Sequence, residues 1–169
     1  MFREVSTCEL KFNVFETIAN EWGVVTMQDK GKVNAMTVNW FQMGHLWRED
    51  VVTVYIRPQR HSYPLLNQEK TFSLCFFAPD EETRKKLAFL GASSGKDCDK
   101  LAECGYSAQY DGVTPFIAQA KWAFICEKIY VQDLERTGFL NQDLADKEYA
   151  ANDYHRMIVA KIKKVLVAQ

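Results

Sequence analysis

The fold prediction starts from two runs of sequence, Asn34-Ala-Met-Thr-Val-Asn-Trp40 and Val51-Val-Thr-Val-Tyr-Ile56. The first predicts a polar strand and the second an apolar strand, with a turn through Gly44 between them. The second run continues directly into Arg57-Pro-Gln-Arg-His-Ser-Tyr63, where Pro58 ends the strand because it cannot donate a hydrogen bond to a sheet. One short segment therefore supplies backbone amides, hydroxyls, an aromatic plate and two guanidinium groups. A planar ligand that carries a phosphate needs that set.

The flanking sequence predicts further strands. Gly23–Gln28 is expected to pair with Val33–Trp40 through a turn at Asp29–Lys32. Val51–Ile56 would complete a three-stranded meander with these two. The clearest strand is Thr71–Phe77, in which every second side chain is apolar. Other strands are predicted at Cys8–Phe12, at Phe116–Val131 and, with a bulge at Lys163 and Lys164, at Tyr154–Val167.

Short helices are predicted between these strands. They are Asn13–Asn20, with Asn13 as the cap and Glu16 completing a capping box, His61–Glu69, a segment that begins at Asp80 and is broken by Gly91–Gly95, and Asp97–Cys104. Residues 132–153 are polar without a clear period and predict an excursion from the barrel. About seven strands without strand-helix alternation favour a mainly β fold, a closed antiparallel barrel of Greek-key type with short helical insertions, over a doubly wound sheet.

Length and charge limit what this barrel can belong to. The 169 residues suffice for one well-buried core, so residues 1–169 are predicted to form a single domain. A formal net charge of -1 argues against a nucleic-acid partner, because binders of the phosphate backbone usually carry a basic excess. We expect no signal peptide and no membrane span, since no stretch approaches the roughly 20 apolar residues of a membrane helix. The five cysteines lack C-x-x-C spacing, which predicts reduced thiols in a cytoplasmic protein.

Four blocks of the sequence together resemble the flavin reductase-like family. They are Asn34–Trp40, Val51–Tyr63, Ser93-Ser-Gly-Lys-Asp-Cys-Asp-Lys100 and Asp153-Tyr-His-Arg-Met157. The blocks follow the family's order and span nearly the whole chain. Members of this family, which includes flavoredoxin, have an FMN-binding split barrel and usually form homodimers. The resemblance implies both features for this protein.

Carried over block by block, the resemblance also implies a flavin site. The residues are Asn34, Ala35, Met36 and Thr37 along the isoalloxazine, Trp40 on a ring face, Arg57, Arg60 and Ser62 at the phosphate, Lys96 at the phosphate or the ring, and His155 at the cofactor edge. A cluster of charged donors suits a phosphate dianion. Flavin carries the hard chemistry in such proteins, so no catalytic side chain is predicted.

The implied reaction is hydride transfer from NAD(P)H to FMN, followed by electron delivery to free flavin or another acceptor. The alternative is a flavin-binding electron carrier or binding module, which exchanges electrons with a redox protein partner and does not turn over nicotinamide. The sequence has no G-x-G-x-x-G fingerprint, so NAD(P)H would bind over the flavin without a motif of its own. The choices between FMN and FAD, and between NADH and NADPH, stay open.

The same residues also have structural readings. Trp40 can be a core residue, Lys96 a solvated lysine and His155 a satisfied structural histidine. Gly91-Ala-Ser-Ser-Gly95 matches the nucleophile pattern of serine hydrolases, but a charged helix precedes it where a strand is required. The three histidines are spread along the chain, which argues against a metal site.

Overall fold

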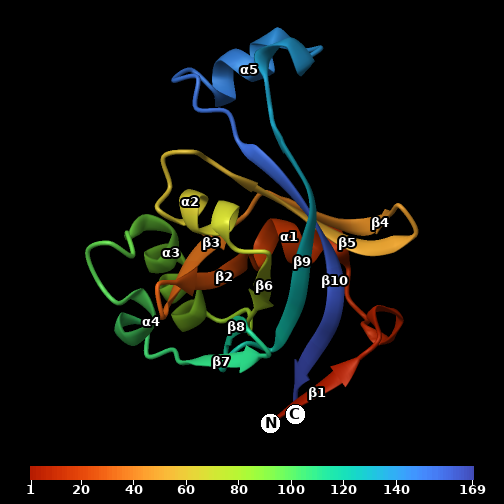
Figure 1. The fold of residues 1–169 in the computed structure, drawn as a ribbon, viewed down its shortest axis with the longest axis vertical. Helices are drawn as coiled ribbons and strands as arrows, with labels where there is room; N and C mark the ends of the chain where they lie inside the picture. Colours follow the sequence, from red (N-terminus) through yellow and green to blue (C-terminus); the bar gives the residue numbers. More distant parts are fainter.

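The computed structural model describes all 169 residues apart from the side chain of Asp29 (Figure 1). Its strands are β1 (Phe2–Val5), β2 (Gly23–Asp29), β3 (Lys32–Val38), β4 (Phe41–Leu46), β5 (Glu49–Ile56), β6 (Thr71–Phe76), β7 (Ala108–Asp111), β8 (Thr114–Ile117), β9 (Trp122–Asp133) and β10 (Arg156–Ala168). Its helices are α1 (Val14–Asn20), α2 (Ser62–Gln68), α3 (Glu81–Ala92), α4 (Lys100–Glu103) and α5 (Gln142–Glu148), with short 3-10 turns η1 (Thr7–Glu9) and η2 (Arg136–Gly138).

Eight strands form one antiparallel sheet around the core. The strand order is β3-β2-β6-β9-β10-β5-β4, and β1 pairs with the end of β10. The β4–β5 ladder continues by one bond beyond Phe41, from the backbone N–H of Tyr55 to the carbonyl of Trp40 at 3.3 Å. β7 and β8 form a separate hairpin. The mainly β barrel with short helices predicted from the sequence is therefore confirmed.

The strands β2 and β6 are buried on both faces, and so they separate two layers of core. Val25 and Leu74 pack inside the barrel, against side chains from the other long strands. Their neighbours Val24 and Cys75 pack on the outer face, with Leu90 of α3. Successive side chains of a strand point to opposite faces, which explains the division. The helices α3 and α4 thus cover the outside of the barrel beside β3.

Between β9 and β10 the chain leaves the barrel as a stalk that ends in α5 (Figure 1). We call residues 134–155 the excursion. At its base, Arg156 pairs with Asp133 across the ladder, with Nε and Nη2 donating to the two carboxylate oxygens at 2.7 and 2.8 Å. Asn141 caps α5 by accepting from the amide of Leu144 at 3.2 Å. The excursion predicted from the polar composition of residues 132–153 is confirmed.

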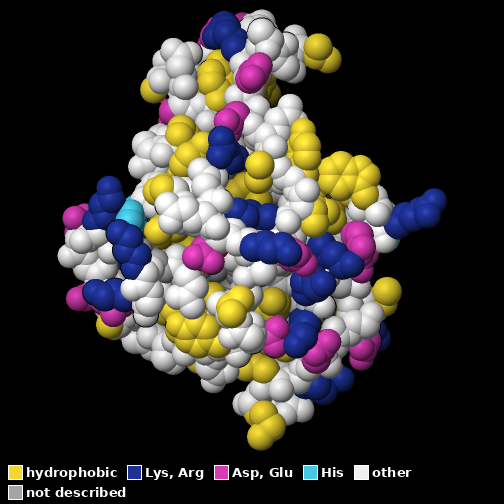
Figure 2. All heavy atoms as spheres, viewed as in Figure 1, with side chains coloured by type: hydrophobic (Ala, Val, Ile, Leu, Met, Phe, Trp, Pro, Cys, Tyr) yellow, Lys and Arg dark blue, Asp and Glu magenta, His cyan; other side chains and the backbone are white. Residues whose placement is uncertain are grey.

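Apolar side chains stay exposed between the excursion and the β4–β5 hairpin (Figure 2). We call Trp47, Ile129, Tyr130 and Val131 the Trp47 patch; their exposed fractions are 58%, 41%, 41% and 48%. The rings of Trp47 and Tyr130 meet edge to face, 5.7 Å apart. Exposed apolar side chains that gather on neighbouring elements can mark an interaction site.

The predicted meander is wrong. Residues 41–46, expected as a turn through Gly44, form β4, which pairs with β5 through a turn at Trp47 and Arg48. Both turn residues have positive φ, 53° and 65°. β5 lies between β10 and β4, and it does not pair with β3 as the predicted meander required. Strands that follow one another in sequence usually pair, but here the long β10 occupies the position beside β5 that the prediction gave to β3.

Two further segments differ from the prediction. Cys8–Phe12 contains no strand, because Ser6 begins η1 and exchanges capping-box hydrogen bonds with Glu9. The apolar run Phe116–Val131 is not one strand but divides into β8 and β9. A turn separates them, closed by a bond from the amide of Ala120 to the carbonyl of Ile117 at 3.1 Å.

Other local predictions are confirmed. Asn13 caps α1 by accepting from two amides of its first turn at 3.1 and 3.3 Å. α3 begins after Asp80, as predicted, and the structure adds that Asp80 caps it by accepting from the amide of Thr83 at 2.8 Å. The register against β9 shifts between Ile162 and Lys164, where the paired lysines predicted a bulge. The side-chain caps and the bulge therefore follow from local sequence alone.

Candidate functional site

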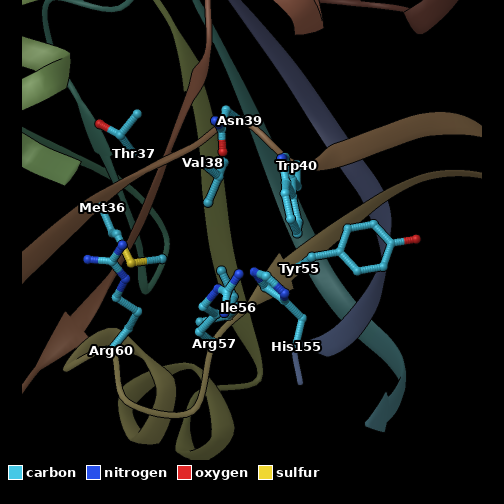
Figure 3. A pocket seen from close by; sticks show the side chains of 10 residues that line it. All are labelled: Met36, Thr37, Val38, Asn39, Trp40, Tyr55, Ile56, Arg57, Arg60 and His155. Atoms are coloured by element: carbon cyan, nitrogen blue, oxygen red, sulfur yellow. The ribbon is translucent and has the colours of Figure 1, made fainter. Parts of the chain in front are cut away.

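Two adjoining cavities open at the end of β3. We name the first, of about 170 Å³, the Trp40 cavity and the second, of about 120 Å³, the Ser62 cavity. The Trp40 cavity is lined by Met36, Thr37, Val38, Asn39, Trp40, Tyr55, Ile56, Arg57, Arg60 and His155 (Figure 3). The Ser62 cavity is lined by Met36, residues 59–62, the loop 91–95 and Lys100. Met36 and Arg60 line both cavities, so the two adjoin as parts of one groove.

Trp40 and His155 stand together at one side of the Trp40 cavity, with Met36 and Arg60 at the other (Figure 3). The two rings have centroids 4.8 Å apart. Trp40 is 39% exposed, whereas His155 is 7% exposed. Trp40 is therefore not a core residue. Its indole offers a flat surface at the rim of the cavity, and the ring of Tyr55 points away from it.

His155 is kept neutral by its surroundings. Its Nδ1 lies 2.9 Å from the hydroxyl of Tyr149, the residue that follows α5. Burial lowers the pKa of His155 to about 4, and the positive charge of Arg57 lowers it as well. When the tyrosine donates to Nδ1, the neutral ring carries its proton on Nε2. His155 then has a hydrogen-bond donor for a ligand in the cavity.

Arg57 ties the excursion to the rim of the Trp40 cavity. Its guanidinium pairs with the carboxylate of Asp153 and donates from Nη2 to the carbonyl of Glu148 at 3.0 Å. It also lies over the rings of Trp40 and Tyr149, 5.9 and 5.2 Å from their centroids. The hydrogen bond from Arg57 lowers the pKa of Asp153. The excursion is thus part of the site, a role that its polar sequence did not reveal.

The Ser62 cavity is built on a buried polar pair. Asn34 Nδ2 donates to Ser62 Oγ at 2.8 Å, and both side chains are buried. Gly95 lies directly against this pair, because a Cβ added to it would stand 2.3 Å from Asn34 Oδ1. Only glycine allows the loop to approach so closely. Since Ser62 Oγ accepts from Asn34, its own hydroxyl proton is available to a ligand.

Arg60 joins the two cavities. Its Nη1 donates to the carbonyl of Gly91 at 3.1 Å, which fixes the guanidinium beside the loop that ends α3. Of the three residues predicted at the phosphate, Arg60 and Ser62 therefore meet in the Ser62 cavity. Arg57 lies in the Trp40 cavity and is already paired with Asp153.

Two lysines of the block Ser93–Lys100 lie in different environments. Lys96, predicted at the ligand, is exposed and lines a neighbouring cavity of about 550 Å³, but neither the Trp40 cavity nor the Ser62 cavity. Lys100 is 4% exposed and lines the Ser62 cavity as well as that larger one. Sequence reasoning missed Lys100 because lysine is rarely buried. The only signal for it was its place in the same matched block.

The other residues predicted along β3 differ in where their side chains point. Ala35 is fully buried in the outer core layer. Thr37 donates from Oγ1 to the carbonyl of Leu87 at 2.5 Å and so anchors α3. Met36, between them, faces both cavities. Ala35 can therefore reach a ligand only through its backbone.

Among the described residues, no three His, Cys, Asp or Glu side chains gather as metal ligands. The five cysteines are free thiols, three of them buried, and burial raises the pKa of Cys75 and of Cys104.

In the part of the chain that the structure describes, no helix has the length and apolarity to cross a membrane.

This antiparallel barrel with short helical insertions belongs to the class of split-barrel proteins. Within that class, the chain matches the model of the flavin reductase-like domain over residues 15–169. The protein is therefore a member of the flavin reductase-like family, as the four sequence blocks predicted. No curated protein sequence matches the chain significantly.

Solved structures support the fold. An FMN-binding protein from Thermus thermophilus with bound 1-cyclohex-2-enone is 21% identical, with a TM-score of 0.65 over 86% of this chain and 69% of that one. Flavoredoxin from Methanosarcina acetivorans is 17% identical, with a TM-score of 0.68 over 98% and 77%. An FMN-binding domain of a flavin reductase-like enzyme from Shewanella baltica is 14% identical, with a TM-score of 0.68 over 99% and 77%. At such identities the likeness establishes the fold alone.

Proposed function

We propose that the protein binds FMN along the Trp40 and Ser62 cavities and passes electrons from NAD(P)H to the flavin or to another acceptor. One observation carries this proposal. The two cavities adjoin, and one presents the flat indole of Trp40 while the other presents the hydroxyl of Ser62 and the guanidinium of Arg60. A ligand with a planar ring at one end and a phosphate at the other matches that division. Membership of the flavin reductase-like family supports the same ligand.

The residues of the groove fit the two ends of FMN. The ring would lie in the Trp40 cavity against Trp40 and Met36, with His155 as a hydrogen-bond donor at its edge. The phosphate would lie in the Ser62 cavity, where Arg60 and Ser62 present charge-assisted and neutral donors. Bound flavin would supply hydride and electron transfer. The protein's own residues bind, orient and partly shield it from water.

His155 and Arg57 support this role in different ways. The hydrogen bond with Tyr149 fixes the orientation of the imidazole, so that a ligand meets a neutral donor. Arg57 holds the excursion, and with it Tyr149, at the rim of the cavity. No side chain has to act as a nucleophile. The acceptor of the electrons is set by what can reach the exposed side of Trp40.

An anaerobic absorbance titration tests the proposal. Purified protein is titrated first with FMN and then with NADH or NADPH. We expect a bound-flavin spectrum that bleaches when nicotinamide is added. Protein that leaves the FMN spectrum unchanged at every concentration would contradict the proposal.

A flavin-binding electron carrier is the second candidate. The rim of the Trp40 cavity favours it, because an indole that is 39% exposed leaves the ligand within reach of a redox protein partner. In the same titration, a carrier would bind FMN and stay oxidised on addition of nicotinamide. Reduction by a redox protein would then be the measurement that supports the carrier.

We also propose that the protein forms a homodimer through the Trp47 patch. Four exposed apolar side chains on two neighbouring elements are costly to leave in water and suit a second copy of the same chain. The mass of one chain is 19.5 kDa, so light scattering of the flavin-loaded protein should give twice that mass. A monomer at micromolar concentration would contradict the dimer.

A further inference from the structure

The excursion has a small aromatic core of its own. The rings of Tyr149 and Tyr154 stack with centroids 4.6 Å apart. Phe139 lies against both, at 5.7 and 6.1 Å from their centroids. Ala145 of α5 is fully buried. The excursion is therefore a folded unit with a defined surface.

Two leucines of the excursion do not join this core. Leu140 is 103% exposed, and Leu144, one helical turn further on, is 47% exposed. Hydrogen bonds fix the backbone that carries them, because Gln142 Nε2 donates to the carbonyl of Phe139 at 2.5 Å and Asn141 caps the helix. Figure 2 shows apolar and acidic side chains together at the end of this projecting segment. The leucines are thus held in water at fixed positions.

The excursion is acidic, whereas the rest of the chain is slightly basic. It contains five Asp or Glu residues and two Lys or Arg residues, a net charge of -3, and the rest of the chain carries +2. Arg136 pairs with Asp146 at 2.5 Å and so holds η2 against α5. Among the described residues, no ion pair includes Glu135, just before η2, or Asp143, in the first turn of α5. We call the two leucines and these two carboxylates the tip surface: Glu135, Leu140, Asp143 and Leu144.

Ring contacts join the aromatic core of the excursion to the Trp40 cavity. Tyr149 meets His155 edge to face, with centroids 5.5 Å apart, and His155 lies 4.8 Å from Trp40. The guanidinium of Arg57 lies over the rings of both Trp40 and Tyr149. A protein that docks at the excursion would therefore be connected to the proposed flavin site by an unbroken series of side-chain contacts.

The charge of the excursion selects among the possible occupants of the tip surface. A symmetric contact between two copies would bring two acidic excursions together, and like charges across an interface are unfavourable. Nucleic acid and anionic membranes are negative as well. A basic protein surface complements the carboxylates, and its apolar centre would cover the leucines. Electron-transfer complexes have small interfaces, which a surface of this kind can supply.

We propose that the tip surface docks a redox protein whose own surface is basic. This inference rests on the proposed function in its carrier form, because that function requires a redox protein partner. The carboxylates steer the partner during encounter, and the leucines supply the apolar contact once it has docked. Docking itself needs no bound flavin, so it can be measured separately from electron transfer.

Amide NMR spectra of the isotope-labelled wild-type protein test the docking surface. The probe is reduced cytochrome c, a small redox protein with a basic surface, and the control probe is an acidic plant-type ferredoxin. At low ionic strength we expect cytochrome c to shift the amides of residues 135–148 and ferredoxin to shift none of them. Raising the ionic strength from about 0.01 M to about 0.15 M shortens the Debye length from about 30 to about 8 Å, so the affinity should fall about tenfold.

Two double variants then separate the apolar and the charged parts of the tip surface. They are Leu140→Ser with Leu144→Ser, and Glu135→Gln with Asp143→Asn. We expect the serine variant to lose about tenfold or more in affinity for cytochrome c. The amide variant should lose about three- to tenfold at low ionic strength, together with much of the salt dependence. Phe15→Ser with Glu16→Gln is the matched control on α1, where Phe15 is 83% exposed, and its affinity should stay within about twofold of the wild type.

The outcomes separate the inference from the proposed function. If cytochrome c shifts no amides of the excursion, or shifts them no more than ferredoxin does, the docking surface is wrong while the flavin site stands. Shifts in the excursion that appear when the protein alone is concentrated would assign the tip surface to a second copy of the chain instead. If cytochrome c docks there but FMN does not bind, the proposed function fails while the tip surface stands as a site for basic proteins.

Discussion

The two ends of the groove are stabilised in opposite ways. At the Ser62 cavity, Asn34, Ser62 and Lys100 are 5%, 2% and 4% exposed. Asn34 donates to Ser62, and Lys100 donates to the carbonyls of Leu90 and Ser93 at the end of α3. At the Trp40 cavity, Arg57 reaches across to Asp153 in the excursion, and their side chains are 24% and 19% exposed. One end is part of the core, and the other depends on a projecting segment.

This difference separates binding from reactivity. A site for the phosphate gains from rigid, desolvated donors, because little conformational entropy is then lost when the ligand binds. A site for the ring must also admit a donor and an acceptor of electrons, which a mobile or exposed wall permits. In the proposed flavin complex, the barrel would therefore supply affinity for the phosphate, and the excursion would control access to the ring.

The largest effect is expected from Gly95→Ala, which disrupts the wall of the Ser62 cavity. The new Cβ would stand 2.3 Å from Asn34 Oδ1, and Asn34 cannot swing away without losing its bond to Ser62. We expect a loss of about 1–3 kcal/mol in the free energy of unfolding, measured by urea denaturation, and a weaker affinity for FMN. Gly44→Ala is the matched control, because its Cβ would meet nothing within 4 Å. An equal loss in both variants would remove the special role of Gly95.

A smaller and more local effect is expected from Arg57→Met, which removes the contacts that hold the excursion at the rim of the Trp40 cavity. Asp153 and the carbonyl of Glu148 would lose their partner. Amide hydrogen exchange in residues 141–153 should then speed up about five- to thirtyfold, equivalent to about 1–2 kcal/mol, while exchange in β6 should not change. Arg136→Met removes an exposed ion pair within the same excursion and should have little effect. Faster exchange in the barrel itself would show that the two ends are not independent.

The smallest effect concerns pH. The pKa of His155 is lowered to about 4 from an ordinary value of 6.5, so the unfolded chain binds the proton more readily than the folded one. Stability is therefore complete above pH 6.5 and is lost as the pH falls from 6.5 to 4. One group can contribute at most about 1.4 kcal/mol per pH unit. Urea denaturation at pH 6.5 and 5.5 should show a shallower pH dependence for His155→Gln than for the wild type; equal slopes would assign the loss to other groups.

Sequence predicted the features that depend on near neighbours. The alternation of Thr71–Phe77 specified β6, and Asn13 and Asp80 marked the first turns of their helices. Each of these signals acts within a few residues, so tertiary structure did not override it. The four spaced blocks then specified the family, because their order is improbable by chance.

Sequence could not predict what depends on distant partners. β4 was missed because Gly44 suggested a turn, while its place in the sheet is set by pairing with Val51. Lys100 gives no local sign of burial, since the loop 91–95 and α3 enclose it. Tyr149 orients His155 through a hydrogen bond between its hydroxyl and His155 Nδ1, and this bond depends on the folded position of the excursion. Such roles become visible only in three dimensions.

Trp40 gives the molecule an optical reporter of its own. The chain has four tryptophans, and Trp40 is the one that lines the cavity assigned to the ring. Indole emission overlaps flavin absorption, so a flavin stacked against Trp40 would quench its fluorescence by energy transfer. A protein that keeps Trp40 and carries phenylalanine at Trp22, Trp47 and Trp122 would therefore signal occupancy of the groove in real time, without any label.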